Sequence, residues 1–195
     1  HKIFKQENDK IFKSEWIYVC HINSINKNQY RTLNINNKNI VVIKNKLEEI
    51  SIFYNTCLHR GSQIFNNQEG SIKAPVIICP YHQWSYDIKS GSLLNTTSLI
   101  LDKFDKKKYA LKKINFFIWK GLIFVNLKSN KKFNVKSIFQ YYDSAIDKID
   151  LENYSVGHVW KKNVFCNWKI YWENYSECLH CPNIHPELSK LVPLY

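Results

Sequence analysis

Two short pairs of metal-ligand residues constrain this chain of 195 residues more than any other feature. One residue separates Cys57 from His59, and two residues separate Cys79 from His82. Gaps this short suit loops at the ends of hairpins, where neighbouring side chains can converge on one point. Gly61 follows the first pair and permits a tight backbone turn because it has no Cβ.

The two pairs together offer two thiolates and two imidazoles. Two thiolates on one iron and two imidazoles on the other form the ligand set of a Rieske [2Fe–2S] cluster. We therefore predict that Cys57, His59, Cys79 and His82 bind such a cluster. The same residue types could bind zinc as a Cys₂His₂ site, although zinc fingers usually place both cysteines before both histidines. A third alternative is that the four are ordinary buried side chains.

The composition narrows the class of protein. Hydrophobic residues make up 45% of the chain and aromatic residues 15%, which indicates a packed globular core. The sequence has no apolar run of about 18 residues and no secretory signal pattern, so we expect no membrane span. The six cysteines lack the spacing of a disulfide framework, which favours a reducing, cytoplasmic setting.

The net charge of +12 raises the question of an acidic partner. The lysines are scattered and no known nucleic-acid-binding module accompanies them, so we expect no nucleic-acid partner. A basic face for an acidic electron-transfer protein remains open.

The first 150 residues have the pattern of many short strands, typical of a small antiparallel sandwich or barrel. An amphipathic helix should precede them, with Ile3, Phe4, Phe12 and Trp16 on one face. The predicted strands cover residues 17–20, 30–33, 40–43, 50–54, 71–73, 76–78, 84–87, 93–94, 111–114, 117–119 and 122–125. We expect turns at 34–39 and at Lys120-Gly121, and a helix near 137–149.

The sequence changes character from Tyr154. We expect one or two strands over residues 154–166, followed by a helix that opens at Asn167. Four aromatic residues form a stripe on that helix: Trp168, Tyr171, Trp172 and Tyr175. Such a stripe is more often part of a core than a cofactor site.

A second group of candidate ligands lies at the end of this helix. Glu177 and His180 lie on nearly one helical face, because successive residues are rotated by about 100°. Pro182 should break the helix near Cys181, which would let His185 return towards His180. Two histidines placed together can supply two ligands of a 2-His-1-carboxylate iron site. The alternative is a surface glutamate with two solvated histidines.

The residues from Cys57 to Gly61 and from Cys79 to Trp84 resemble the Rieske motif of ring-hydroxylating and demethylating oxygenase alpha subunits. The stretch from Asn167 to Pro186 is similar to the corresponding part of that family, in the same order. The resemblance implies an α+β fold, with an all-β Rieske domain followed by the start of an α+β helix-grip-type catalytic domain. We assign residues 1–38 to an N-terminal helix and strand segment, 39–150 to the Rieske domain and 151–195 to the truncated catalytic domain.

The resemblance also implies an activity. The protein would be a terminal oxygenase that receives electrons from a reductase or ferredoxin and passes them to a mononuclear Fe(II) at His180 and His185. The iron would activate O₂ to hydroxylate or demethylate an aromatic or quaternary ammonium compound, such as glycine betaine, carnitine or choline. Glu177 would connect the cluster of one subunit to the iron of the next in a homotrimer, and Glu rather than Asp favours the quaternary ammonium branch.

One departure from the family pattern limits this interpretation. The third iron ligand of the family is a downstream Asp, which the chain does not reach, and Asp143, Asp147 and Asp150 precede the histidines. We therefore expect a fragment that is truncated at both ends, holds the cluster, binds mononuclear iron weakly or not at all, and is inactive by itself. The alternative function is a Rieske-type electron-transfer protein without oxygenase activity.

Overall fold

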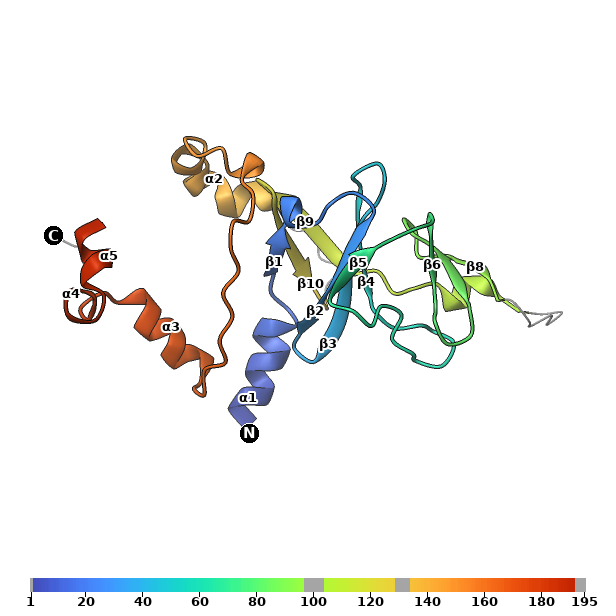
Figure 1. Cartoon of the computed structure of the whole chain (residues 1–195). Helices are drawn as coiled ribbons and strands as arrows, with labels where there is room; N and C mark the ends of the chain where they lie inside the picture. Colours follow the sequence, from blue (N-terminus) through green and yellow to red (C-terminus); the bar gives the residue numbers. More distant parts are fainter. Residues whose placement is uncertain (1, 97–103, 129–133, 192–195) are drawn as a thin grey trace. The chain divides into compact units, whose positions relative to one another are not determined.

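The computed structural model describes residues 2–96, 104–128 and 134–191 (Figure 1). The chain forms two compact units, residues 1–157 and 158–195, which are treated separately below. The α+β class is confirmed, because antiparallel sheets are accompanied by several helices. The domain boundaries predicted at residues 38 and 150 stay a prediction.

Three antiparallel sheets build the first unit. The sheets have the orders β1-β10-β9, β4-β3-β2-β5 and β6-β7-β8. Their strands are β1 (Ile17–His21), β2 (Gln29–Ile35), β3 (Lys38–Lys44), β4 (Ile50–Tyr54), β5 (Glu69–Ser71), β6 (Val76–Ile78), β7 (Ser85–Asp87), β8 (Leu93–Asn95), β9 (Asn115–Trp119) and β10 (Leu122–Asn126). Most of the predicted strands are confirmed.

Strand β3 is the centre of this unit because both of its faces are buried. Val41 and Ile43 belong to a core cluster that also contains both candidate cysteine ligands. Ile40 and Val42 point to a second cluster, formed with residues of β1, β4 and β10. An uninterrupted apolar run is what a strand buried on both faces requires. The side that carries Val41 and Ile43 positions the candidate ligand loops.

Two hairpin turns fix the strand registers. Asn36 and Asn37 both have positive φ, as do Lys120 and Gly121, and each pair joins strands without further loop residues. Two positive-φ residues give the type I′ turn that matches the twist of a hairpin. Both predicted turns are confirmed.

The remaining elements of the first unit correct several predictions. Its helices are α1 (Lys2–Glu7), the π-helix η1 (Asn8–Phe12), η2 (Ile22–Ser24), η3 (Lys106–Tyr109), α2 (Val135–Ile146) and η4 (Leu151–Asn153). The amphipathic helix therefore ends earlier, and no residue of α1 or η1 is buried. Residues 111–114 form no strand, because only Lys113 makes a bridge, to Phe53. The strand expected at 71–73 ends at Ser71.

The second unit contains α3 (Trp168–Ser176), α4 (Cys181–Ile184) and α5 (Pro186–Leu191). The start of α3 was predicted correctly, since the Asn167 side chain accepts a hydrogen bond from the Lys169 N–H. The strands expected over 154–166 are absent; after η4 this segment has no regular structure and is exposed. None of the described helices is long and apolar enough to cross a membrane.

The predicted break at Pro182 is wrong in its position. Helix α3 already ends at Ser176, and Glu177 has extended backbone angles. Pro182 instead lies in the first turn of α4, where its missing N–H costs no helical hydrogen bond. The aromatic stripe of α3 is largely exposed within this unit, with Trp172 60% and Tyr175 70% accessible.

Candidate metal centres

The two candidate ligand loops have the same backbone hydrogen bonds. The N–H of Cys57 donates to the Ser62 carbonyl at 2.8 Å, and the N–H of Cys79 donates to the Trp84 carbonyl at 2.8 Å. In each loop the N–H of the fourth residue after the cysteine donates back to the cysteine carbonyl. That residue has positive φ in both loops: Gly61 at 74° and Gln83 at 60°. The Gly61 turn is thus confirmed, and its counterpart in the second loop is not a glycine.

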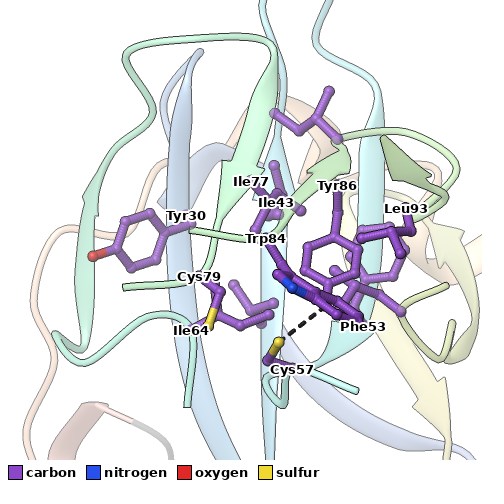
Figure 2. Packing of buried hydrophobic residues seen from close by; sticks show 13 residues of the cluster. Tyr30, Ile43, Phe53, Cys57, Ile64, Ile77, Cys79, Trp84, Tyr86 and Leu93 are labelled. Carbon is purple, nitrogen blue, oxygen red and sulfur yellow. Dashed lines mark hydrogen bonds between the residues drawn. The ribbon is translucent and has the colours of Figure 1, made fainter. Parts of the chain in front are cut away.

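Both cysteines lie in the core, each 1% exposed (Figure 2). The Tyr86 Oη is 3.0 Å from Cys57 Sγ. Burial raises the pKa of Tyr86, as does its contact with Cys57, so the phenol stays protonated and can donate to this sulfur. Burial likewise raises the pKa of the Cys57 thiol, while hydrogen bonds from Tyr86 and the His59 N–H oppose that effect. A bound metal would be needed to hold a thiolate in such a place.

The first candidate histidine is held between aromatic rings. His59 stacks on Trp84, with centroids 4.4 Å apart and planes 8° from parallel. Its Nδ1 is buried and has no hydrogen-bond partner among the described residues. Burial lowers the pKa of His59, and the neighbouring His82 and Arg60 lower it further. The ring is therefore favoured in its neutral form, which is the form that binds metals.

The second candidate histidine lies next to the first. The rings of His59 and His82 are 4.6 Å apart, and His82 also contacts Tyr81, which is 59% exposed. Two buried cysteines, together with two neighbouring imidazoles of which one has an orphaned ring nitrogen, supply the ligand types of a cluster that takes one ligand pair on each iron. In the described part of the chain, no three His, Cys, Asp or Glu side chains form a single-ion metal site.

A buried asparagine fastens the first loop to the sheet. Asn55 is 1% exposed, and its Nδ2 donates to Asn39 Oδ1 at 2.6 Å and to the Phe65 carbonyl at 2.8 Å. Its Oδ1 accepts hydrogen bonds from the N–H groups of Ile64 and Phe65. One side chain thus ties both ends of the Cys57 loop to the strand beside it.

The second candidate centre is formed by residues at both ends of α4, with Glu177 and His180 before this helix and His185 after it. Glu177 Oε1 is 2.5 Å from His180 Nδ1, and its Oε2 accepts the Leu179 N–H at 2.8 Å. The hydrogen bond with His180 and then that from Leu179 lower the pKa of Glu177, so this carboxylate is ionised. The rings of His180 and His185 are 5.6 Å apart. The predicted approach of the two histidines is therefore observed, although the chain bends before Pro182.

Sequence reasoning missed Tyr86, Asn55 and the stacking of Trp84 on His59. Tyr86 offered a weak signal, because an inward residue of the strand after the second loop must face that loop. Asn55 offered none, since a polar residue before a loop is ordinarily solvated. The roles assigned to the four cluster ligands, to Glu177 and to both C-terminal histidines stay predictions.

The fold and these two centres define a class of protein: an iron–sulfur domain joined to the start of an oxygenase catalytic domain. The family model for the Rieske [2Fe-2S] domain matches residues 15–104, and the model for the ring hydroxylating alpha subunit (catalytic domain) matches residues 151–194. The chain belongs to the Rieske oxygenase alpha subunits, a family with a [2Fe–2S] cluster and a mononuclear iron site.

Curated relatives refine this placement. The glycine betaine monooxygenase oxygenase subunit of Pseudomonas aeruginosa (strain UCBPP-PA14) is 32% identical over 194 residues, which are 98% of this chain and 44% of the relative. The carnitine monooxygenase oxygenase subunit of Escherichia coli (strain K12) is 29% identical over 196 residues, 97% of this chain and 50% of the relative. The chain thus spans about half the length of these relatives.

Solved structures show the same fold. The quaternary ammonium Rieske monooxygenase CntA, in complex with L-carnitine, superimposes with a TM-score of 0.82 at 28% identity, covering 97% of this chain and 54% of that one. The naphthalene 1,2-dioxygenase of Rhodococcus sp. gives a TM-score of 0.80 at 24% identity, over 97% and 44% of the two chains. The second likeness shows the fold alone.

Proposed function

We propose that the whole protein is the terminal oxygenase component of a Rieske oxygenase system, which hydroxylates or demethylates a small organic substrate. One observation carries the proposal: a single chain holds two matching Cys/His loops as well as a carboxylate-bound histidine beside a second histidine. A pure electron carrier would need only the loops. The names of the relatives support a quaternary ammonium substrate such as glycine betaine or carnitine.

In this proposal the candidate ligands form two metal sites with different roles. When bound, the cluster supplies one-electron transfer and the mononuclear iron supplies dioxygen activation. Cys57 and Cys79 would hold one iron of the cluster, and His59 and His82 the other. His180 and His185 would hold the mononuclear iron; because Glu177 occupies Nδ1 of His180, the Nε2 of that ring remains for the metal.

Glu177 has a second role in this proposal. It would accept a hydrogen bond from His82 of a neighbouring subunit while it holds His180, so that both rings are oriented by one carboxylate. This arrangement requires an oligomer, for which we propose a homotrimer, supplied by a reductase or ferredoxin in the cytoplasm.

The cluster assignment is tested by absorption spectroscopy of the purified protein. Cys57→Ser and His82→Ala should each abolish the visible bands of the cluster, because each removes one of four ligands. Cys166→Ser, which changes an exposed cysteine, is the matched control and should keep them. A colourless unmodified protein, or colour that survives either ligand change, would refute the assignment.

The oxygenase assignment is tested in the whole protein. Glu177→Ala should retain both metals and lose turnover by about 100-fold or more, since the carboxylate orients a ligand and lies on the transfer path. Glu187→Ala, at an exposed acid of α5, should be close to the unmodified enzyme. Metal analysis together with glycine betaine- and carnitine-dependent oxygen uptake gives the answer; undiminished uptake in the Glu177 variant would contradict the role of Glu177.

A further inference from the structure

The two candidate histidines make different ring contacts on the way to the surface. His82 contacts the exposed Tyr81. His59 instead stacks on the buried Trp84, which contacts Phe104 at 5.7 Å and Tyr109 at 5.5 Å between centroids. The last two rings stack on each other at 4.7 Å. A continuous series of aromatic contacts therefore runs from His59 to the 3₁₀-helix η3.

That helix carries a concentrated positive charge. Lys106, Lys107 and Lys108 occupy three of its four positions and are exposed. Lys112 and Lys113 follow and are also exposed. The two chain segments that hold the candidate ligands, residues 55–68 and 72–86, contain no Asp or Glu. Glu69 and Asp87 directly follow these segments. The acid nearest in sequence to the lysines of η3, Asp105, caps that helix by accepting the Lys107 N–H.

We propose that the basic turn of Lys106, Lys107 and Lys108 docks an acidic electron-donor protein, and that the rings of Tyr109, Phe104 and Trp84 connect this docking site to His59. This inference rests on the proposed function and names the surface at which its donor arrives. In the transfer the donor is oxidised by one electron and the cluster is reduced by one, so no bond is formed or broken. The side of the cluster at His82 and Tyr81 then remains for the electron that leaves the cluster.

Charge reversal on the whole, cluster-containing protein tests the docking site. The variant is Lys106→Glu/Lys107→Glu/Lys108→Glu. The matched control is Lys2→Glu/Lys5→Glu/Lys10→Glu, which changes the net charge equally at exposed positions of α1 and η1. Changing the three lysines of η3 to Arg keeps the charge. The probe is an acidic plant-type [2Fe–2S] ferredoxin, with affinity measured by titration calorimetry at several salt concentrations and cluster reduction followed by stopped flow.

If the three lysines of η3 form the docking site, their change to Glu should weaken ferredoxin binding and slow cluster reduction by about tenfold or more at low salt. The difference should fade as salt screens the charges. The α1/η1 control should differ from the unmodified protein by less than about threefold, and the Arg variant should match it. Reduction by dithionite, which needs no docking, should be the same for all.

Several results would overturn the docking site: equal losses in both reversed variants, no loss in either, or binding of the unmodified protein that does not depend on salt. The visible spectrum recorded before mixing separates this failure from that of the proposed function. A colourless protein refutes the proposed function, whereas a coloured protein with unaltered binding in the η3 variant refutes only the docking site.

Discussion

At the scale of residues, Tyr86 contacts a candidate ligand without being one itself. Its hydroxyl meets Cys57 Sγ, and its ring is fully buried. Cysteine and histidine types with short gaps could be recognised in the sequence because the ligand chemistry dictates them. Tyr86 gave only a weak signal in the sequence, since its contact depends on how β7 pairs with β6 and β8.

Tyr86→Phe should lower the reduction potential of the cluster and leave its visible bands in place. A hydrogen bond to a sulfur stabilises the reduced, more negative cluster, so its loss favours the oxidised form. One hydrogen bond of about 0.5–1.5 kcal/mol corresponds to roughly 20–60 mV for one electron. A redox titration followed by absorption measures the change; Tyr18→Phe, at a half-exposed ring of β1, is the control. An unchanged or raised potential would contradict the hydrogen bond.

At the scale of elements, the hairpins were predictable and the loops only in part. Two-residue turns between strand-forming runs, alternating in β2 and continuously apolar in the centres of β3, β9 and β10, specify these four strands from local sequence. Residues 111–114 were misread because their apolar pattern serves the core: Leu111 and Ile114 are buried, one in each cluster, without forming a ladder. Residues 154–166 have strand-forming side chains, but none of the described strands pairs with them.

Asn55→Ala should destabilise the first ligand loop. The change leaves the N–H groups of Ile64 and Phe65 without their acceptor in a buried place, which costs about 2–4 kcal/mol in unfolding free energy. We also expect faster loss of the cluster's visible bands on mild heating. Denaturant unfolding measures the first effect, and Asn66→Ala, at an exposed position of the same loop, should change stability by less than about 0.5 kcal/mol. Equal effects of the two changes would contradict the role of Asn55.

At the scale of the whole molecule, the two units differ in how much they bury. Both core clusters lie within residues 1–157. In that unit Asn23 donates to the carbonyls of Glu152, in η4, and of Tyr154, which follows η4. In residues 158–195, Cys181 is the one described residue that is buried. The order of the two units could be predicted from the motifs. Their extent could not be predicted, because burial depends on contacts between residues far apart in sequence.

Residues 1–157 should fold as an independent domain and retain the cluster. All four candidate ligands and both cores are present in that length. We expect a cooperative unfolding transition and the same visible spectrum as the longer chain, measured by circular dichroism and absorption. The same domain with Cys57→Ser is the control for colour, and a truncated domain that neither folds nor binds iron would show that residues 158–195 are needed.

The shared backbone of the two ligand loops hides a difference of one step. Measured from its cysteine, the histidine stands at the second position in one loop and at the third in the other. A rotation that superimposed the two loops would therefore leave the imidazoles unmatched, one turned to Trp84 and the other to Tyr81. The nearly symmetric backbone thus gives the candidate centre two chemically different sides, so electrons can enter it on one side and leave it on the other.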